Sequence, residues 1–287
     1  MGKAAVKSLF HLILTAATFV LAAVTILASR SGHYHPESST VMPLLGLAVP
    51  VLLVSCLIVS LCWAVARKKW AFVTLIAFFF NWEYLTAVIR FGSARDIPAT
   101  ASAPNHQGKP GGYLTVATYN VHNFGNEITG YSCKEIARYM RQQHVDVLCF
   151  QEFGGNKHFT ADSLRRALSH WQYALIPADD SIRGLLPIAV FSRYPLTGGR
   201  FITYPHSSNC SMLCDIVAGT DTIRLLNNHL QTTGVSRNRK KWGRELTTDN
   251  TRREAQAVQD AAETLHENFV KRAAQTDSIC HLAIAAP

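Results

Sequence analysis

Two stretches of sequence decide the fold that we expect for the C-terminal half of this chain: VATYNVHNFG at residues 116–125 and DVLCFQEF at residues 146–153. Each begins as an apolar run typical of a strand and ends in polar side chains. A third run with the same design is RLLNNHLQT at residues 224–232. Because ligand sites in mixed sheets commonly collect at strand ends, we expect these three ends to form one site.

The side chains at these strand ends indicate a particular chemistry. They are amides, a carboxylate and an imidazole, within the strings TYNVH (118–122), CFQE (149–152) and NNHL (227–230). A carboxylate beside an amide makes a hard oxygen site that suits Mg²⁺, which also takes water and substrate phosphate as ligands. A neighbouring imidazole can hydrogen-bond or protonate a phosphate oxygen. Together these groups predict metal-assisted cleavage of a phosphate ester.

The rest of this half alternates strand and helix patterns. We expect helices over 132–143, 161–168 and 251–273, and further strands over 186–191, 212–217 and 222–227. In the long helix an apolar stripe recurs at helical spacing, and Thr251 and Glu254 have the spacing of a capping box. These patterns favour a mixed α+β domain that begins at residue 113.

The N-terminal third has the composition of a membrane anchor. Residues 8–29 and 41–66 contain no Asp, Glu, Lys or Arg, and a helix of about 20 such residues crosses a bilayer. Residues 70–91 are a weaker third candidate, because Asn81, Glu83 and Arg90 follow its apolar first half. A cleavable signal peptide is the alternative for the first run. Its length and the two apolar runs that follow favour an anchor.

The basic residues set the expected orientation of this anchor. Lys3 and Lys7 precede the first run, and Arg67, Lys68 and Lys69 lie between the second and third. Both clusters should be cytoplasmic. Three spans then place the C-terminal domain outside the cytoplasmic (inner) membrane, whereas two would leave it inside. Residues 92–112, rich in Gly, Pro, Ala and Ser, are expected to be a flexible linker between the anchor (1–91) and the domain (113–287).

With IAVFSRYP at residues 188–195, the strings above resemble, in this order, the endonuclease/exonuclease/phosphatase family. The resemblance covers roughly residues 113–285 and implies a deoxyribonuclease-I-like αββα sandwich. It implies that Asn120 and Glu152 bind a divalent metal ion, either Mg²⁺ or, as an alternative, Mn²⁺. It also implies that His229 is a catalytic residue in contact with the scissile phosphate. The substrate would be a phosphate ester of nucleic acid, sugar or lipid head group, with no obligate protein partner. The apolar N-terminal segments resemble those of a membrane-anchored bacterial branch.

Two strings expected from the family do not occur in this sequence. They are Gly-Asp-x-Asn and a later Ser-Asp-His, which in the family supply a nucleophile-positioning pair and an Asp–His base. We therefore expect a C-terminally truncated chain with an incomplete sandwich, half a site, and little or no activity. The alternative is an intact domain repurposed for binding.

The charge distribution supports a second hypothesis from another class. Residues 1–111 hold 9 Lys and Arg against 3 Asp and Glu, and residues 112–287 hold 19 against 16, so the high pI does not by itself indicate nucleic acid. However, residues 237–253 contain seven Lys or Arg around Trp242. This stretch could bind polyphosphate, nucleic acid or anionic lipid, or be a solvated flexible loop. In the former case the chain would be a non-catalytic, membrane-tethered module for anionic ligands.

Three further groups have open assignments. Arg193 follows a strand pattern, where it either contacts phosphate or belongs to a Pro-started turn. His122 lies two residues past Asn120 and is interpreted mainly as a loop histidine. Cys210 and Cys214 have no His or Cys cluster beside them, so a zinc site is not expected, although a disulfide between them is an alternative.

Overall fold

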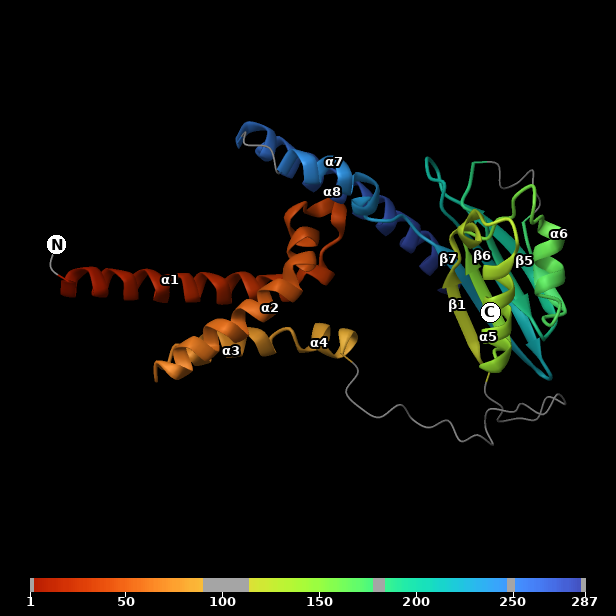
Figure 1. Cartoon of the computed structure of the whole chain (residues 1–287). Helices are drawn as coiled ribbons and strands as arrows, with labels where there is room; N and C mark the ends of the chain where they lie inside the picture. The colour runs from red at the N-terminus through yellow and green to blue at the C-terminus, as the bar shows by residue number, and fades with distance from the viewer. Residues whose placement is uncertain (1–2, 90–113, 178–183, 247–250, 285–287) are drawn as a thin grey trace. The chain divides into compact units, whose positions relative to one another are not determined.

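The computed structural model of the chain describes residues 3–89, 114–177, 184–246 and 251–284 (Figure 1). These residues form two compact units. One comprises residues 1–93 together with 232–287, and the other comprises residues 94–231. The expected linker at 92–112 lies outside the described residues, so the domain limits drawn from the sequence stay a prediction. Each unit is described separately below.

The unit of residues 94–231 contains two sheets. The first has the order β1-β2-β4-β3, with strands β1 (Val116–Asn120), β2 (Val147–Gln151), β3 (Tyr173–Leu175) and β4 (Ile188–Ser192). Here β1 and β2 are parallel, and β4 is antiparallel to both β2 and β3. The second is an antiparallel meander of β5 (Leu196–Thr203), β6 (Cys210–Ala218) and β7 (Asp221–His229).

Strand β2 is buried along its whole length because it has a hydrophobic core on each face. Val147 and Cys149 face the second sheet, where they pack with Met212 and Cys214 of β6. Leu148 and Phe150 belong to a second hydrophobic core, on the face of the sheet that the helices cover. A strand covered on both sides needs a continuous apolar run, which is the pattern of VLCF.

Helices α5 (Tyr131–Gln142) and α6 (Ala161–Ala167) contribute the opposite side of that second core. Cys133 and Ala137 of α5 and Leu164 of α6 pack there, with Trp171 fully enclosed and its Nε1 donating to the Val145 carbonyl at 3.0 Å. The layers are therefore helices, first sheet, second sheet. This confirms the mixed α+β class.

The other unit begins with apolar helices: α1 (Lys3–Ser29), α2 (Val41–Val65), α3 (Ala71–Phe79) and α4 (Trp82–Val88), with short 3₁₀ turns η1 (Ser31–His33) and η2 (Pro36–Ser38) between α1 and α2. Within the described parts of the chain, two helices, α1 and α2, are long and apolar enough to cross a membrane. Helices α3 and α4 are bent by 60° at their junction and count as a third span only if the pair forms one crossing.

Polar side chains tie these helices together from within. Trp63 Nε1 of α2 donates to Thr18 Oγ1 of α1 at 2.9 Å, and Thr25 Oγ1 lies 3.3 Å from Cys56 Sγ. Asn81, at the α3–α4 junction, donates to the Thr25 carbonyl at 3.1 Å. Such inward-facing polar contacts between apolar helices favour a packed bundle.

Several elements differ from the sequence expectation. Strand β5 is not among the strands expected from the sequence. Gly198 and Gly199 lie at a bulge in its pairing with β6, and Gly198 has φ +63°. The short strand β3 was also missed. The basic stretch begins in a helix, α7 (Val235–Leu246), and not in a flexible loop. The long helix α8 (Thr251–Ile284) extends beyond residue 273.

All seven cysteines are free. Cys210 and Cys214 are therefore not joined by a disulfide, and both are buried in the core between the sheets, as is Cys149.

The ion pair between Asp146 and Arg193 gives a test of this fold. The Asp146 carboxylate is fully buried at the start of β2, with Arg193 Nη1 3.1 Å from its Oδ1. Arg193→Ala should lower the free energy of unfolding by about 3–5 kcal/mol, because it leaves a buried carboxylate without its cation. Urea unfolding of the detergent-solubilised chain, followed by near-ultraviolet circular dichroism, measures this.

The matched control is Arg224→Ala, which removes a more exposed Arg–Asp pair with Asp215 on the second sheet. It should leave the urea midpoint nearly unchanged. Equal shifts in the two variants would contradict the burial of Asp146.

Candidate active site

Asn120, Glu152 and His229 come together at one edge of the sheets. Asn120 Nδ2 donates to Glu152 Oε1 at 2.9 Å, and His229 Nε2 lies 3.5 Å from the same oxygen. The parallel register explains the first contact, since Asn120 at the end of β1 is opposite Gln151 at the end of β2. His229 is the last residue of β7. The convergence expected from the three strand ends is thus present.

The backbone at Glu152 is held in an unusual conformation. Glu152 has φ +51°, in the left-handed region that non-glycine residues rarely adopt, and His122 and Asn123 have φ +45° and +50°. Hydrogen bonds hold both segments in place: Val121 N–H donates to the Gln151 carbonyl at 2.9 Å, and Asn123 N–H to the Glu152 carbonyl at 2.8 Å. Strained residues of this kind cluster at functional sites.

His122 belongs to the site, contrary to its main sequence interpretation as a loop residue. Its Nδ1 lies 2.8 Å from Glu152 Oε2, and its backbone N–H donates to Asn120 Oδ1 at 3.0 Å. The His122 side chain is 80% exposed, whereas that of Glu152 is 16% exposed. His122 therefore lies over Oε2 of a largely buried carboxylate, while its own ring is open to solvent.

The surroundings of Glu152 and His229 lower the pKa of both side chains. Burial acts to raise the pKa of Glu152, but hydrogen bonds from Asn120 and His122 and the charges of the two histidines bring it below its ordinary value. Burial lowers the pKa of His229, which the charge of Glu152 partly opposes. Glu152 is accordingly a carboxylate near neutral pH, and His229 an uncharged imidazole.

A buried amide network fixes the two sheets directly behind these residues. Asn227 of β7 donates through Nδ2 to the carbonyls of Phe150 and Ala189, at 3.0 and 3.1 Å, and its Oδ1 accepts from Gln151 Nε2 at 2.7 Å. Gln151 also donates to Thr118 Oγ1 at 3.0 Å. Asn227 is 2% exposed. One side chain thus joins the second sheet to β2 and β4 of the first.

The donor set fits a hard divalent cation. One carboxylate and one amide converge, and a half-turn of the Asn120 amide would present Oδ1 in place of Nδ2. Among the residues that the structure describes, no group of three or more His, Cys, Asp or Glu is placed to hold a metal ion. A hard divalent cation held by Asn120 and Glu152 would take water and substrate as its remaining ligands.

Arg193 is not brought to this edge. It follows β4, which runs antiparallel to β2, so it lies beside the start of β2 and pairs there with Asp146. Glu152 follows the other end of the same strand. The structure thus does not bring Arg193 together with Asn120, Glu152 and His229, and its phosphate contact stays a prediction.

The basic stretch is only partly described. The side chains of Arg237, Arg239 and Lys240 lie outside the described residues. Lys241 Nζ is 3.5 Å from the Asp260 carboxylate of α8, an exposed pair between the two C-terminal helices. The anion-binding role of residues 237–253 stays a prediction.

The two-sheet fold thus presents an amide, a carboxylate and an imidazole together at one edge. A family model described as Endonuclease/Exonuclease/phosphatase family matches residues 117–270. The chain therefore belongs to the endonuclease/exonuclease/phosphatase family. A second model, a domain of unknown function (DUF8431), matches residues 10–88.

Solved structures of TDP2 from Caenorhabditis elegans are similar to the chain. One has 15% sequence identity and a TM-score of 0.35, with 69% of this chain and 62% of that chain covered. A truncated form has 17% identity and a TM-score of 0.34, with coverage of 48% and 57%. The chain thus spans about three fifths of the length of these structures, at 62% and 57%. No curated protein matches the chain.

The amide network predicts that Asn227 stabilises the strands behind the site. Asn227→Ala leaves Gln151 Nε2 and two strand carbonyls without this partner, and should cost about 2–3 kcal/mol of local stability. Hydrogen exchange measured by mass spectrometry on peptides that cover β2 and β4 should show the loss. Asn228→Ala, one residue further along the same strand, is the control; equal exchange in both variants would contradict the assignment.

Proposed function

We propose that the chain is a Mg²⁺-dependent phosphoesterase whose site is formed around Asn120, Glu152 and His229. The observation that carries this proposal is the contact of both Asn120 and His229 with one oxygen of Glu152, at 2.9 and 3.5 Å. Membership of the endonuclease/exonuclease/phosphatase family supports the phosphoesterase class. Beyond family membership, we propose the identity of the ion, the class of substrate and the activity of this chain.

Each residue has a distinct role in this proposal. Asn120 and Glu152 hold the ion, which when bound polarises a phosphoryl oxygen of the substrate. His229 is buried at the end of β7 and directs Nε2 to the same carboxylate, so a phosphate held there lies within reach of its ring. The backbone conformation at Glu152 fixes the carboxylate before substrate arrives, which avoids reorganisation during the reaction. No residue is assigned to activation of the nucleophile.

The proposal extends to the setting of the reaction. The substrate is a phosphate ester of nucleic acid, sugar or lipid head group. The chain is embedded in the cytoplasmic (inner) membrane by its N-terminal helices, with the catalytic domain outside. This placement needs three crossings: α1, α2 and the bent α3–α4 pair counted as one span. With the Lys and Arg clusters on the cytoplasmic side, three crossings leave the domain outside.

Glu152→Gln tests the metal and the chemistry separately. The variant keeps the shape of the side chain but removes the charge that attracts the cation, so Mn²⁺ affinity measured by electron paramagnetic resonance should fall at least about tenfold. Mg²⁺-dependent hydrolysis of bis(p-nitrophenyl) phosphate should be abolished.

Glu135→Gln is the matched control, because this carboxylate pairs with Arg138 on the exposed face of α5. It should leave Mn²⁺ affinity and hydrolysis unchanged. If Glu152→Gln keeps full metal affinity, the proposed metal site is wrong; anion binding without any metal would instead favour a non-catalytic module.

A fusion experiment tests the membrane orientation. Alkaline phosphatase joined after residue 112 should be active in bacterial cells, because that enzyme folds only where its disulfides can form. The same fusion after residue 68, between the second and third apolar segments, should be inactive. An inactive fusion at 112 would show that the α3–α4 pair does not cross the membrane.

A further inference from the structure

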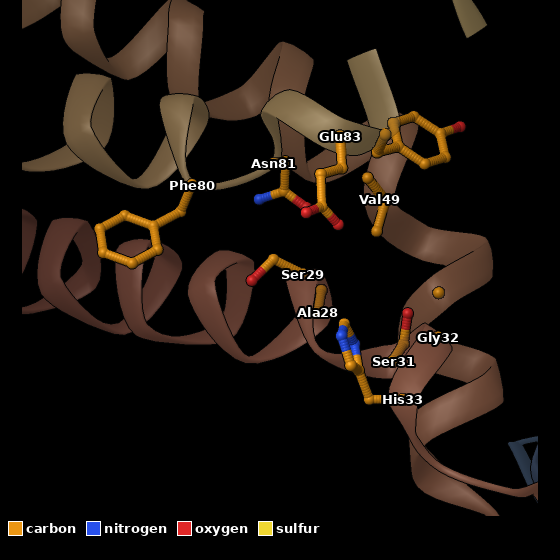
Figure 2. Close-up of a pocket in the computed structure, with 11 residues that line it drawn as sticks. Ala28, Ser29, Ser31, Gly32, His33, Val49, Phe80, Asn81 and Glu83 are labelled. Atoms are coloured by element: carbon orange, nitrogen blue, oxygen red, sulfur yellow. The ribbon is translucent and has the colours of Figure 1, made fainter. Parts of the chain in front are cut away.

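A cavity of about 340 Å³ lies where the chain turns from α1 to α2 and meets the α3–α4 junction. Its walls include Ser29 and Ser31 on one side and Asn81 and Glu83 on the other. Figure 2 shows the Asn81 and Glu83 side chains extending into this space opposite Ser29. This cavity belongs to the N-terminal helices alone and has no part in the phosphoesterase site.

Asn81 presents an unused hydrogen-bond acceptor to the cavity. It is 2% exposed, and its Nδ2 donates to two carbonyls, those of Thr25 at 3.1 Å and Ala77 at 3.2 Å. Because only the amide nitrogen can donate to carbonyls, these two bonds fix which way the amide faces. Its Oδ1 is buried and has no hydrogen-bond partner. A buried polar atom in this state costs free energy until a donor reaches it.

Two further acceptors line the same cavity. Glu83 contributes a carboxylate, and within the described part of the chain no Lys, Arg or His pairs with it. Ser29 donates its hydroxyl hydrogen to the Ile26 carbonyl at 2.7 Å, so toward the cavity its oxygen can only accept. The cavity thus offers a full negative charge and two neutral acceptors.

These features match a primary ammonium group better than a metal ion. A primary ammonium has three N–H donors, one for each of Asn81, Glu83 and Ser29. Among the described residues, no three metal-ligating side chains are grouped to hold an ion here. The cavity is also far larger than a single ion needs.

We propose that this cavity binds the primary ammonium of an ethanolamine-type head group. The cavity lies at the ends of α1 and α2, the two helices long enough to cross a membrane, and so at the level of lipid head groups whichever way the chain is inserted. Ser31 and His33 line the cavity as well and offer donors to a phosphate oxygen of the same head group. A quaternary ammonium has no N–H donor and should not satisfy Asn81.

Isothermal titration calorimetry of the full chain in dodecyl maltoside tests the proposal. Dihexanoyl phosphatidylethanolamine should bind at least about tenfold more tightly than dihexanoyl phosphatidylcholine, because the choline group cannot donate to the three acceptors. Glu83→Gln should weaken ethanolamine-lipid binding about tenfold or more, and Ser29→Ala should weaken it severalfold. Neither substitution removes a contact between the helices.

Glu37→Gln is the control, since Glu37 lies in the nearby turn η2 but outside the cavity wall. It should leave binding unchanged. Free ethanolamine, titrated separately, distinguishes the sources: affinity equal to that of the lipid supports an ammonium site filled from solution, and weaker affinity supports a membrane head group. The proposal is overturned if both lipids bind equally, if neither binds, or if Glu83→Gln binds as the unsubstituted chain does.

Discussion

The hydrogen bonds of the buried Asn227 amide join the two sheets at the place where the site residues gather. Asn227 contacts strand carbonyls of β2 and β4 and the Gln151 side chain, and Gln151 immediately precedes Glu152. A buried polar group that loses its hydrogen-bond partner costs considerable free energy. These groups therefore favour a single arrangement of the two sheets. The separation of His229 from Glu152 depends on that arrangement, because the two residues come from different sheets.

The sequence alone was sufficient to predict that three of the site residues come together. Asn120, Glu152 and His229 each follow or end a short apolar run, and strand ends of a mixed sheet are where such side chains meet. The same reasoning could not place Arg193, because an apolar run such as IAVFS does not reveal whether its strand runs parallel or antiparallel to its neighbour. His122 was underestimated because its approach to Glu152 depends on successive left-handed backbone conformations. The role of Asn227 depends on contact between two sheets, which a single sequence does not show.

Two polar residues made the third apolar segment a weaker candidate for a membrane span. In the structure they lie at a bend and beside a cavity. Asn81 lies at the break between α3 and α4, where its amide reaches across to the Thr25 carbonyl of α1. Glu83, a costly residue in the middle of a span, lines a cavity at the end of the helices. Polar residues in an apolar segment therefore mark a place where the segment bends around a polar space, in agreement with the functional use that such residues commonly have in membranes.

The buried thiols have a consequence if, as proposed, the domain lies outside the cytoplasm. Burial raises the pKa of Cys133, Cys149 and Cys210 to about 12 and that of Cys214 to about 11. Because only the thiolate reacts readily with oxidants or disulfides, these four groups are chemically protected while the cores stay closed. The protection ends on unfolding, when Cys149 and Cys214 from facing sheets are free to form wrong disulfides. Outside the cytoplasm, thiol oxidation would then convert a brief opening of the sheets into permanent loss of the fold.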